Sequence, residues 1–325
     1  MKHQIFIFLF TVFCFSVEAQ EFLSSLRYDF IADNREYFNQ YSTPQTIIGS
    51  RLDVQTGFKF DSVHRVMFGG SYLYEFGHRL DGHIPVLDLY YRYYDTKFDV
   101  LLGSFPRRNL LHYPLIMFAD TVEYFRPNIQ GAYISYNFKY GSQSVWLDWT
   151  GRQTATVREM FITGISGKLQ YGVVYIKDHF HYWHRAGMAN DSIRDIRDNN
   201  SFSILAGLDF AEKTKLDTLY FGVGFVTSSD KVRPAQPYTS VGLLSECSVF
   251  YKRIGCQVSY YYGEAPSIAF GDPIYSSKNY LRTNIVWIPF KHRFVHSKVV
   301  FGIHLVNGDI DYSQQILVSV NLNNK

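Results

Sequence analysis

The chain has 325 residues, a formal net charge of +3 and an aromatic content of 18%, a length that suits one large β-domain or two ordinary domains. A charge this close to neutral, with no block of five like charges, gives no support for nucleic acid as a partner. Beyond residue 20 the chain holds two cysteines, Cys247 and Cys256, which excludes a fold built on a disulfide framework.

The first 19 residues have the pattern of a secretory signal peptide. A weakly basic start precedes the apolar run Ile5–Val17, and Val17 and Ala19 occupy the positions where a signal peptidase requires small residues. We expect cleavage between Ala19 and Gln20, which divides the chain into a signal peptide, 1–19, and a mature protein, 20–325. The apolar run is shorter than the ~20 residues that a transmembrane helix needs. No later stretch approaches 18 apolar residues, so no transmembrane helix is expected.

Period-two alternation of apolar and polar side chains recurs along the rest of the chain. In the stretch RLDVQTGFKF, Leu52, Val54 and Phe58 alternate with polar neighbours, and QQILVSVNLN near the end does the same. Such alternation indicates strands, not helices. We count about 16 segments, with 14 as the alternative. Their centres are near Tyr28, Val54, Ser71, Tyr90, Leu101, Tyr133, Leu147, Phe161, Val173, Leu205, Phe221, Ser245, Ser259, Ile285, Phe301 and Val318.

The connections between these segments alternate in length. Short turns follow the even-numbered segments, as at Asp61-Ser62 and at Ser166-Gly167-Lys168. Longer polar loops follow most odd-numbered segments, over residues 33–45, 77–83, 105–128, 150–156, 178–200, 227–237, 263–278 and 307–311. Short turns at one end and long loops at the other are typical of an antiparallel up-and-down transmembrane β-barrel, which lipid requires to be closed. A secreted sandwich or propeller would explain the apolar faces but not the one-sided loops.

The connection from Phe105 to Asn128 is 24 residues long and contains three prolines. Loops of this length are uncommon and usually functional. Signal peptide, strand count, unequal ends and long third loop together resemble the 16-stranded bacterial outer-membrane porins, whose third external loop folds into the barrel and narrows the pore. The resemblance implies the outer membrane of a Gram-negative bacterium, contact with its lipid, and passive diffusion of small hydrophilic solutes or ions. A homotrimer follows by analogy alone. The chain departs from many such barrels in its end, Asn323-Asn324-Lys325, which lacks a terminal aromatic residue.

Charged residues of this insert suit a pore constriction, where clusters of charge set ion preference. The constriction candidates are Arg107, Arg108, Asp120, Glu123 and Arg126. The pore-lining candidates on the polar faces of the strands are Arg27, Asp29, Arg51, Asp53, Asp88, Arg92, Arg282, His296 and Lys298. We expect the basic members of the first, second, fourteenth and fifteenth segments to form a wall across from Asp120 and Glu123. Alternatively, the loop's own arginines line the eyelet, or the loop packs outside as a cap or subunit latch.

The stretch DHFHYWH contains three histidines, His179, His181 and His184. His179 and His181 share a strand face, which leaves a zinc or copper site open. The spacing fits no established signature, so interfacial side chains are the preferred interpretation and no metal or other cofactor is predicted. Cys247 and Cys256 flank one turn and either form a disulfide or face the lipid.

Catalytic motifs are lacking in the sequence. We find no Gly-x-Ser-x-Gly, His-Glu-x-x-His or phosphate loop, and Ser297 and His304 lie on opposite faces of one segment. We therefore expect a diffusion channel that is not an enzyme. The alternative is a non-conducting barrel that serves as an enzyme platform or as a component of secretion or surface attachment.

Overall fold

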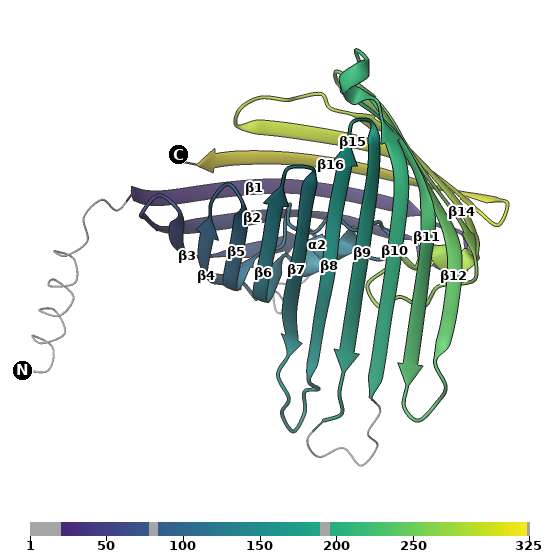
Figure 1. Cartoon of the computed structure of the whole chain (residues 1–325), viewed down its shortest axis with the longest axis horizontal. Helices are drawn as coiled ribbons and strands as arrows, with labels where there is room; N and C mark the ends of the chain where they lie inside the picture. Colours follow the sequence, from purple (N-terminus) through teal and green to yellow (C-terminus); the bar gives the residue numbers. More distant parts are fainter. Residues whose placement is uncertain (1–20, 78–83, 189–195, 324–325) are drawn as a thin grey trace, which may run out of the picture.

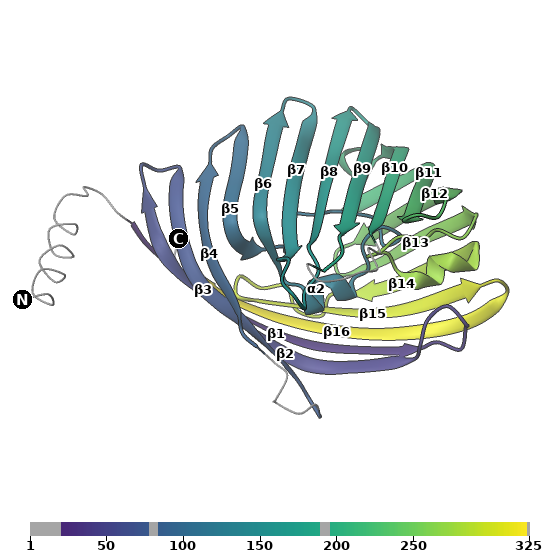
Figure 2. The same ribbon diagram turned by 90° about the horizontal axis from the view of Figure 1, so that it is seen from below.

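The computed structural model describes residues 21–77, 84–188 and 196–323. The expected signal peptide and most of the second long loop, 77–83, lie outside these residues. Sixteen antiparallel strands follow one another around a closed barrel, and the first strand pairs with the last. The predicted fold is thereby confirmed (Figures 1 and 2).

The strands are β1 (Glu21–Glu36), β2 (Gln45–Phe60), β3 (His64–Glu75), β4 (Val86–Tyr94), β5 (Phe98–Pro106), β6 (Asn128–Phe138), β7 (Gly141–Gly151), β8 (Met160–Tyr171), β9 (Val174–Arg185), β10 (Arg197–Asp209), β11 (Thr218–Val232), β12 (Tyr238–Tyr251), β13 (Ile254–Gly263), β14 (Asn279–Trp287), β15 (Val295–Val306) and β16 (Asp309–Asn323). Helical turns in the described ranges are α2 (Thr121–Phe125), η2 (Ala211–Lys213) and η3 (Pro273–Ser277). None of them is long and apolar enough to cross a membrane.

Alternation along β1 shows how the sequence divides between the lumen and the lipid. Asp29, Ile31 and Asp33 are buried inside the barrel, whereas Leu26 and Tyr28 are exposed on the outer wall. A lipid-facing wall must be apolar, and only a closed sheet leaves no unpaired edge in the bilayer. The pairing of β1 with β16, from Ser25 opposite Asn323 to Glu36 opposite Tyr312, closes that edge. By loop length, the ends that carry the long loops face the exterior.

Several sequence-based boundaries were wrong, and two of them concern the place of a turn. The eighth long loop, predicted at 307–311, is a two-residue turn, because Asn307 and Gly308 both take positive φ angles (52° and 102°) that suit a tight hairpin. The predicted turn at 166–168 lies inside β8, and the chain reverses instead at Gly172, whose φ is 58°. Gly164 in the same strand serves packing rather than turning: a Cβ there would lie 2.5 Å from the Tyr113 hydroxyl.

Two loops turn back into the barrel and fill much of its cross-section. The third loop, 107–127, and the seventh loop, 264–278, bond to each other where the Ala119 amide donates to the Phe270 carbonyl and the Asp272 amide to the Leu115 carbonyl (2.8 and 2.9 Å). α2 belongs to the third loop and lies within the curve of the strands (Figure 2). The third and seventh loops together are called the plug below.

The plug is held by two apolar clusters inside the barrel. The first cluster is centred on Ile116, Met117, Ile274 and Tyr275, all buried, and rests on inward side chains of β10 to β15. The second cluster joins Phe105, Ile129, Tyr133, Trp146 and Ile162 with partly buried residues of both loops. An apolar interior of this kind is a packed core rather than a water-filled channel wall.

Candidate functional site

The third loop is anchored on one side by a buried ion pair. Arg107 forms an ion pair with Asp148 of β7 and donates hydrogen bonds to the carbonyls of Arg126 and Asn128 (3.1 Å each). Burial lowers the pKa of Arg107, while Asp148 favours its charged form. An unpaired charge at this depth would be strongly unfavourable, so the pair fixes the loop on the β7 side.

Tyr113 forms a second anchor on the same side. Its hydroxyl lies 2.9 Å from the carbonyls of Ile165 and Phe180 and accepts a hydrogen bond from Trp146 Nε1 at 2.9 Å. Burial raises the pKa of this phenol, which therefore stays neutral. The ring packs between β7 and β9, where Gly164 makes room for it.

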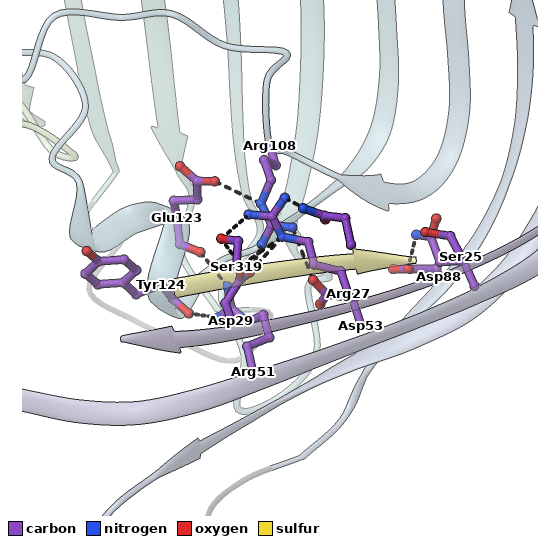
Figure 3. A network of polar contacts seen from close by, with 12 residues as sticks. Ser25, Arg27, Asp29, Arg51, Asp53, Asp88, Arg108, Glu123, Tyr124 and Ser319 are labelled. Carbon is purple, nitrogen blue, oxygen red and sulfur yellow. Dashed lines mark hydrogen bonds and ion pairs between the residues drawn. The ribbon is translucent and has the colours of Figure 1, made fainter. Parts of the chain in front are cut away.

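The opposite side of the loop contacts β1, β2 and β14. Asp120 forms an ion pair with Arg35 (2.8 Å) and lies 3.8 Å from Arg282. Arg51 donates to the carbonyls of Glu123 and Tyr124 (Figure 3). Burial alone would raise the pKa of Asp120, but the two arginines hold it below its usual value. The loop thus reaches both sides of the barrel.

The predicted basic wall is not separated from the acidic residues of the loop. Asp120 is in ion-pair contact with Arg282, a member of that wall. Arg108 of the loop contacts Asp29, Asp53 and Glu123 at 2.9, 3.2 and 3.4 Å (Figure 3). The transverse charge separation was a wrong expectation, because inward positions on β1 and β2 alternate in sign and neutralise the loop's charges locally.

The remaining predicted pore-lining residues all lie on the inner wall. Asp88 accepts hydrogen bonds from Gln55 and Asn128, and Arg92 forms an ion pair with Asp99 at 2.8 Å. Arg27 is paired with Asp29 at 2.9 Å. His296 is opposite Ser319, which contacts Asp29, whereas Lys298 borders a cavity. Arg126 of the loop stacks over the Phe270 ring, 5.6 Å from its centre.

Polar cavities remain beside the plug. One of about 740 Å³ is bordered by Arg92, His112, Lys177 and several serines. Another of about 290 Å³ lies between the third loop and the wall of β1, β2 and β14 to β16. Arg108 borders both. This side chain therefore lies where a solute path from one cavity to the other would pass.

The three histidines of the DHFHYWH stretch do not converge. His179 and His181 face the lumen, where they hydrogen bond Ser203 (3.0 Å) and Ser201 (3.2 Å). His184 faces outward on β9. Across the described ranges, no group of three histidine, cysteine or acidic residues is placed to hold a metal ion. Cys247 and Cys256 are free thiols opposite Val258 and Val249.

His184 belongs to a polar group on the outer wall at the external ends of β9 and β10. Its Nδ1 lies 2.6 Å from Asp198 Oδ1, and the Tyr182 hydroxyl donates to the same oxygen at 2.7 Å. Arg233 donates to the other carboxylate oxygen at 3.0 Å, and Lys231 is opposite Asp198 on β11. We name His184, Asp198, Tyr182, Lys231 and Arg233 the rim group.

The geometry of the rim group orients an imidazole base. A carboxylate only accepts hydrogen bonds, so His184 Nδ1 carries the proton toward Asp198 and Nε2 presents its lone pair. The His184 ring packs against Phe161, with ring centres 5.3 Å apart. Phe180 and Phe202 lie two same-face positions deeper, beyond Tyr182 and Asn200. The imidazole therefore lies between the charged residues at the strand ends and aromatic residues deeper on the outer wall.

Sequence reasoning missed this pair because it assigned residues 178–200 to a loop. In the structure, β9 continues to Arg185 and β10 begins at Arg197. His184 is then directly opposite Asp198. If residues 180, 182 and 184 had been taken as one face of a strand, His184 would have been placed on the outer wall. Asp198, which lies directly opposite in β10, shares that face.

A second histidine chain is enclosed in the interior. His304 contacts the Tyr280 hydroxyl at 2.6 Å and Ser313 Oγ at 2.8 Å. His304 and Tyr280 are fully buried, and Ser313 is nearly so. Tyr37 of the first loop packs against His304. A lipid or solute has no access to Ser313. The hydrogen bonds of Tyr280, His304 and Ser313 therefore stabilise the packed interior and do not form a catalytic site.

Comparison with protein families gives a match over nearly the whole chain. The model of a family described as "Lipid A 3'-O-deacylase-type" matches residues 19–322. The expectation that the chain is not an enzyme is therefore wrong, because this is an enzyme family. A search of curated proteins finds no match.

Comparison of structures finds outer-membrane proteins. The anion-selective porin from Comamonas acidovorans has a TM-score of 0.58 and 9% identity, with 94% of this chain and 99% of that chain covered. A loop L8 deletion mutant of OmpT from Vibrio cholerae has a TM-score of 0.53 and 11% identity, with 94% of this chain and 99% of that chain covered. OmpF of Salmonella typhi in complex with daunomycin has a TM-score of 0.51 and 8% identity, with 92% of this chain and 97% of that chain covered.

At such low identity these likenesses show the fold alone. They confirm the predicted resemblance to the fold of the 16-stranded porins. The rejection of catalysis rested on the lack of linear motifs, and a pair formed across two strands leaves no such motif in the sequence.

Proposed function

Because the chain belongs to the lipid A 3'-O-deacylase-type family, we propose that it is an outer-membrane hydrolase that removes an ester-linked acyl chain from a lipid A-type glycolipid. The observation that carries the proposal is the His184–Asp198 pair on the lipid-facing wall. The ester bonds of an outer-leaflet glycolipid lie between head group and acyl chains, and the rim group lies at the external ends of β9 and β10 with Phe180 and Phe202 deeper on the same face. The barrel is then the platform that holds the pair at this depth.

The rim group supplies a base and positive charge for ester hydrolysis. His184 Nε2 takes a proton from a water molecule, whose oxygen attacks the ester carbonyl carbon. Asp198 holds the imidazole and stabilises its protonated form. Arg233 and Lys231 offset the charge that develops on the carbonyl oxygen. The ester C–O bond then breaks, and the proton passes from His184 to the leaving alkoxide, which gives a fatty acid and an alcohol.

Fatty acid release from lipid A in mixed detergent micelles tests this assignment. Replacement of the base by His184→Gln is expected to slow release by about 10²- to 10⁴-fold. Asp198→Asn is expected to slow it as well, because the imidazole loses the carboxylate that orients it. His292→Gln, in the exposed turn between β14 and β15, serves as the control and is expected to retain the full rate. Equal rates in the wild type and His184→Gln would reject the rim group as the site.

A second function, passive diffusion of small hydrophilic solutes or ions, is favoured by the cavities that meet at Arg108. The third loop would select by size and charge at this point. Current steps across a planar bilayer test it. Arg108→Gln is expected to change the preference between anions and cations under a salt gradient, since a central positive charge is removed. Folded, inserted protein that gives no current steps would limit the lumen to a structural role.

A further inference from the structure

The smaller lumenal cavity, of about 290 Å³, has more basic than acidic side chains around it. Five basic residues border it, Arg27, Arg51, Arg108, Arg282 and Lys298, against three acidic residues, Asp29, Asp120 and Glu123. Its volume lies at the lower end of the range for ligand pockets, about 300–1,000 Å³, which suits a small ligand. The site is thus compact and its lining is more basic than acidic, while Asp53 and Asp272 contact Arg108 and Arg282 from outside the lining at 3.2 and 3.9 Å.

The acidic residues of the cavity are already engaged. Asp29 contacts Arg27 and Arg108 at 2.9 Å each. Asp120 is shared between Arg35 and Arg282. Glu123, which is half exposed, lies 3.4 Å from Arg108. Within the described residues these carboxylates have no ion-pair contact with Arg51 or Lys298.

Arg51 and Lys298 are the basic residues of the lining that form no ion pair among the described residues, although Asp53 and Asp29 lie near Arg51 and Asp120 lies near Lys298. Arg51 is 3% exposed, donates only to two backbone carbonyls, and has a buried Nε without a hydrogen-bond partner among the described residues. Lys298 lies on β15 at the cavity wall and has no hydrogen bond or ion pair among those residues. Buried charges are normally paired, so both side chains indicate a missing anionic partner.

We propose that this cavity binds a small dianion of the phosphate class between Arg51 and Lys298. A guanidinium presents several N–H donors in a plane that matches phosphate oxygens, and an ammonium group adds a point charge. Anions of the phosphate class carry about one and a half to two negative charges near neutral pH, which offsets the charge of the two side chains that form no ion pair. The site lies inside the barrel and is separate from the rim group, so its failure would leave the proposed hydrolysis untouched.

Calorimetric titration of inorganic phosphate into detergent-purified wild-type protein at pH 7.5 and low ionic strength tests the proposal. Saturable binding with one site is expected. Lys298→Gln is expected to weaken it at least tenfold, and Arg51→Gln should weaken it too. Lys213→Gln, in the exposed turn η2, removes the same charge elsewhere and should leave the affinity unchanged. A heat-dependent gel shift confirms that each variant is folded.

The proposal would be overturned by no saturable binding of phosphate to the wild type, by an unchanged affinity in folded Lys298→Gln, or by binding of succinate as tight as that of phosphate. Equally tight binding of succinate would show that the cavity binds any small dianion by its charge and does not select the phosphate class. Loss of binding in Lys213→Gln to the same degree as in Lys298→Gln would place the anion outside the cavity.

Discussion

The position of the plug depends on the charge of one of its side chains, the Asp120 carboxylate. Asp120 lies between Arg35 and Arg282, and these partners lower its pKa below the ordinary value of 3.8 despite burial. A carboxylate with a depressed pKa in the folded state stabilises that state above its unfolded pKa and loses this contribution as the pH falls through the folded value. The anchor on the β1 side is therefore stable at neutral pH and weakened by acid.

This linkage predicts a pH-dependent difference between wild type and Asp120→Asn. Above about pH 4, the wild type should melt at the higher temperature, since only its charged Asp120 binds Arg35 and Arg282. As the pH falls toward 2 the difference should disappear, because the wild-type carboxylate becomes neutral. Melting temperatures of both proteins in detergent, followed by intrinsic fluorescence between pH 2 and 7, provide the measurement. A constant difference over this range would show that Asp120 does not act through its charge.

At the scale of elements, the third loop is a folded part of the interior. Arg107 and Tyr113 fix it to β7 to β9, and Asp120 fixes it to β1 and β14. The length and charges of the loop were visible in the sequence. The burial of its apolar residues Ile116 and Met117 against the seventh loop was not predicted, because contacts between two irregular loops leave no periodic pattern.

Removal of Arg107 is expected to detach the β7 side of the plug. Arg107→Ala leaves the Asp148 carboxylate buried without its partner, a change that costs about 3–5 kcal/mol for a buried pair. Amide hydrogen exchange in residues 107–127 should then become faster while exchange in the strands stays slow. Arg152→Ala, in the exposed fourth loop, is the matched control and should behave like the wild type. Uniformly faster exchange in all strands would mean that Arg107 supports the barrel and not the loop alone.

At the scale of the whole molecule, the barrel could be predicted from the sequence and its chemistry could not. Period-two alternation and one-sided loop lengths predict sixteen strands. Side chains of every strand alternate between two faces, and the face toward the lipid must be apolar in each strand. Errors arose where a glycine had another role, as at Gly164 and Gly167, or where a turn was tighter than expected, as at Asn307 and Gly308. These depend on contacts between distant segments.

Candidate residues were predicted in the right compartment but with the wrong neighbours. Every pore-lining candidate faces the lumen, yet Arg35, which binds Asp120, was not among them. The rim group escaped notice because its members come from three strands and one loop. Barrel closure and strand register, which set such pairs, become known only from the structure.

The mass of lipid A extracted from outer membranes tests the central claim most directly. Cells that produce the wild-type protein are compared with cells that produce equal, folded amounts of His184→Gln or His292→Gln. We expect lipid A that has lost one ester-linked acyl chain in the wild type and in His292→Gln, and intact lipid A in His184→Gln. Intact lipid A in all three strains, or the same loss in all three, would contradict a hydrolase that acts through the rim group.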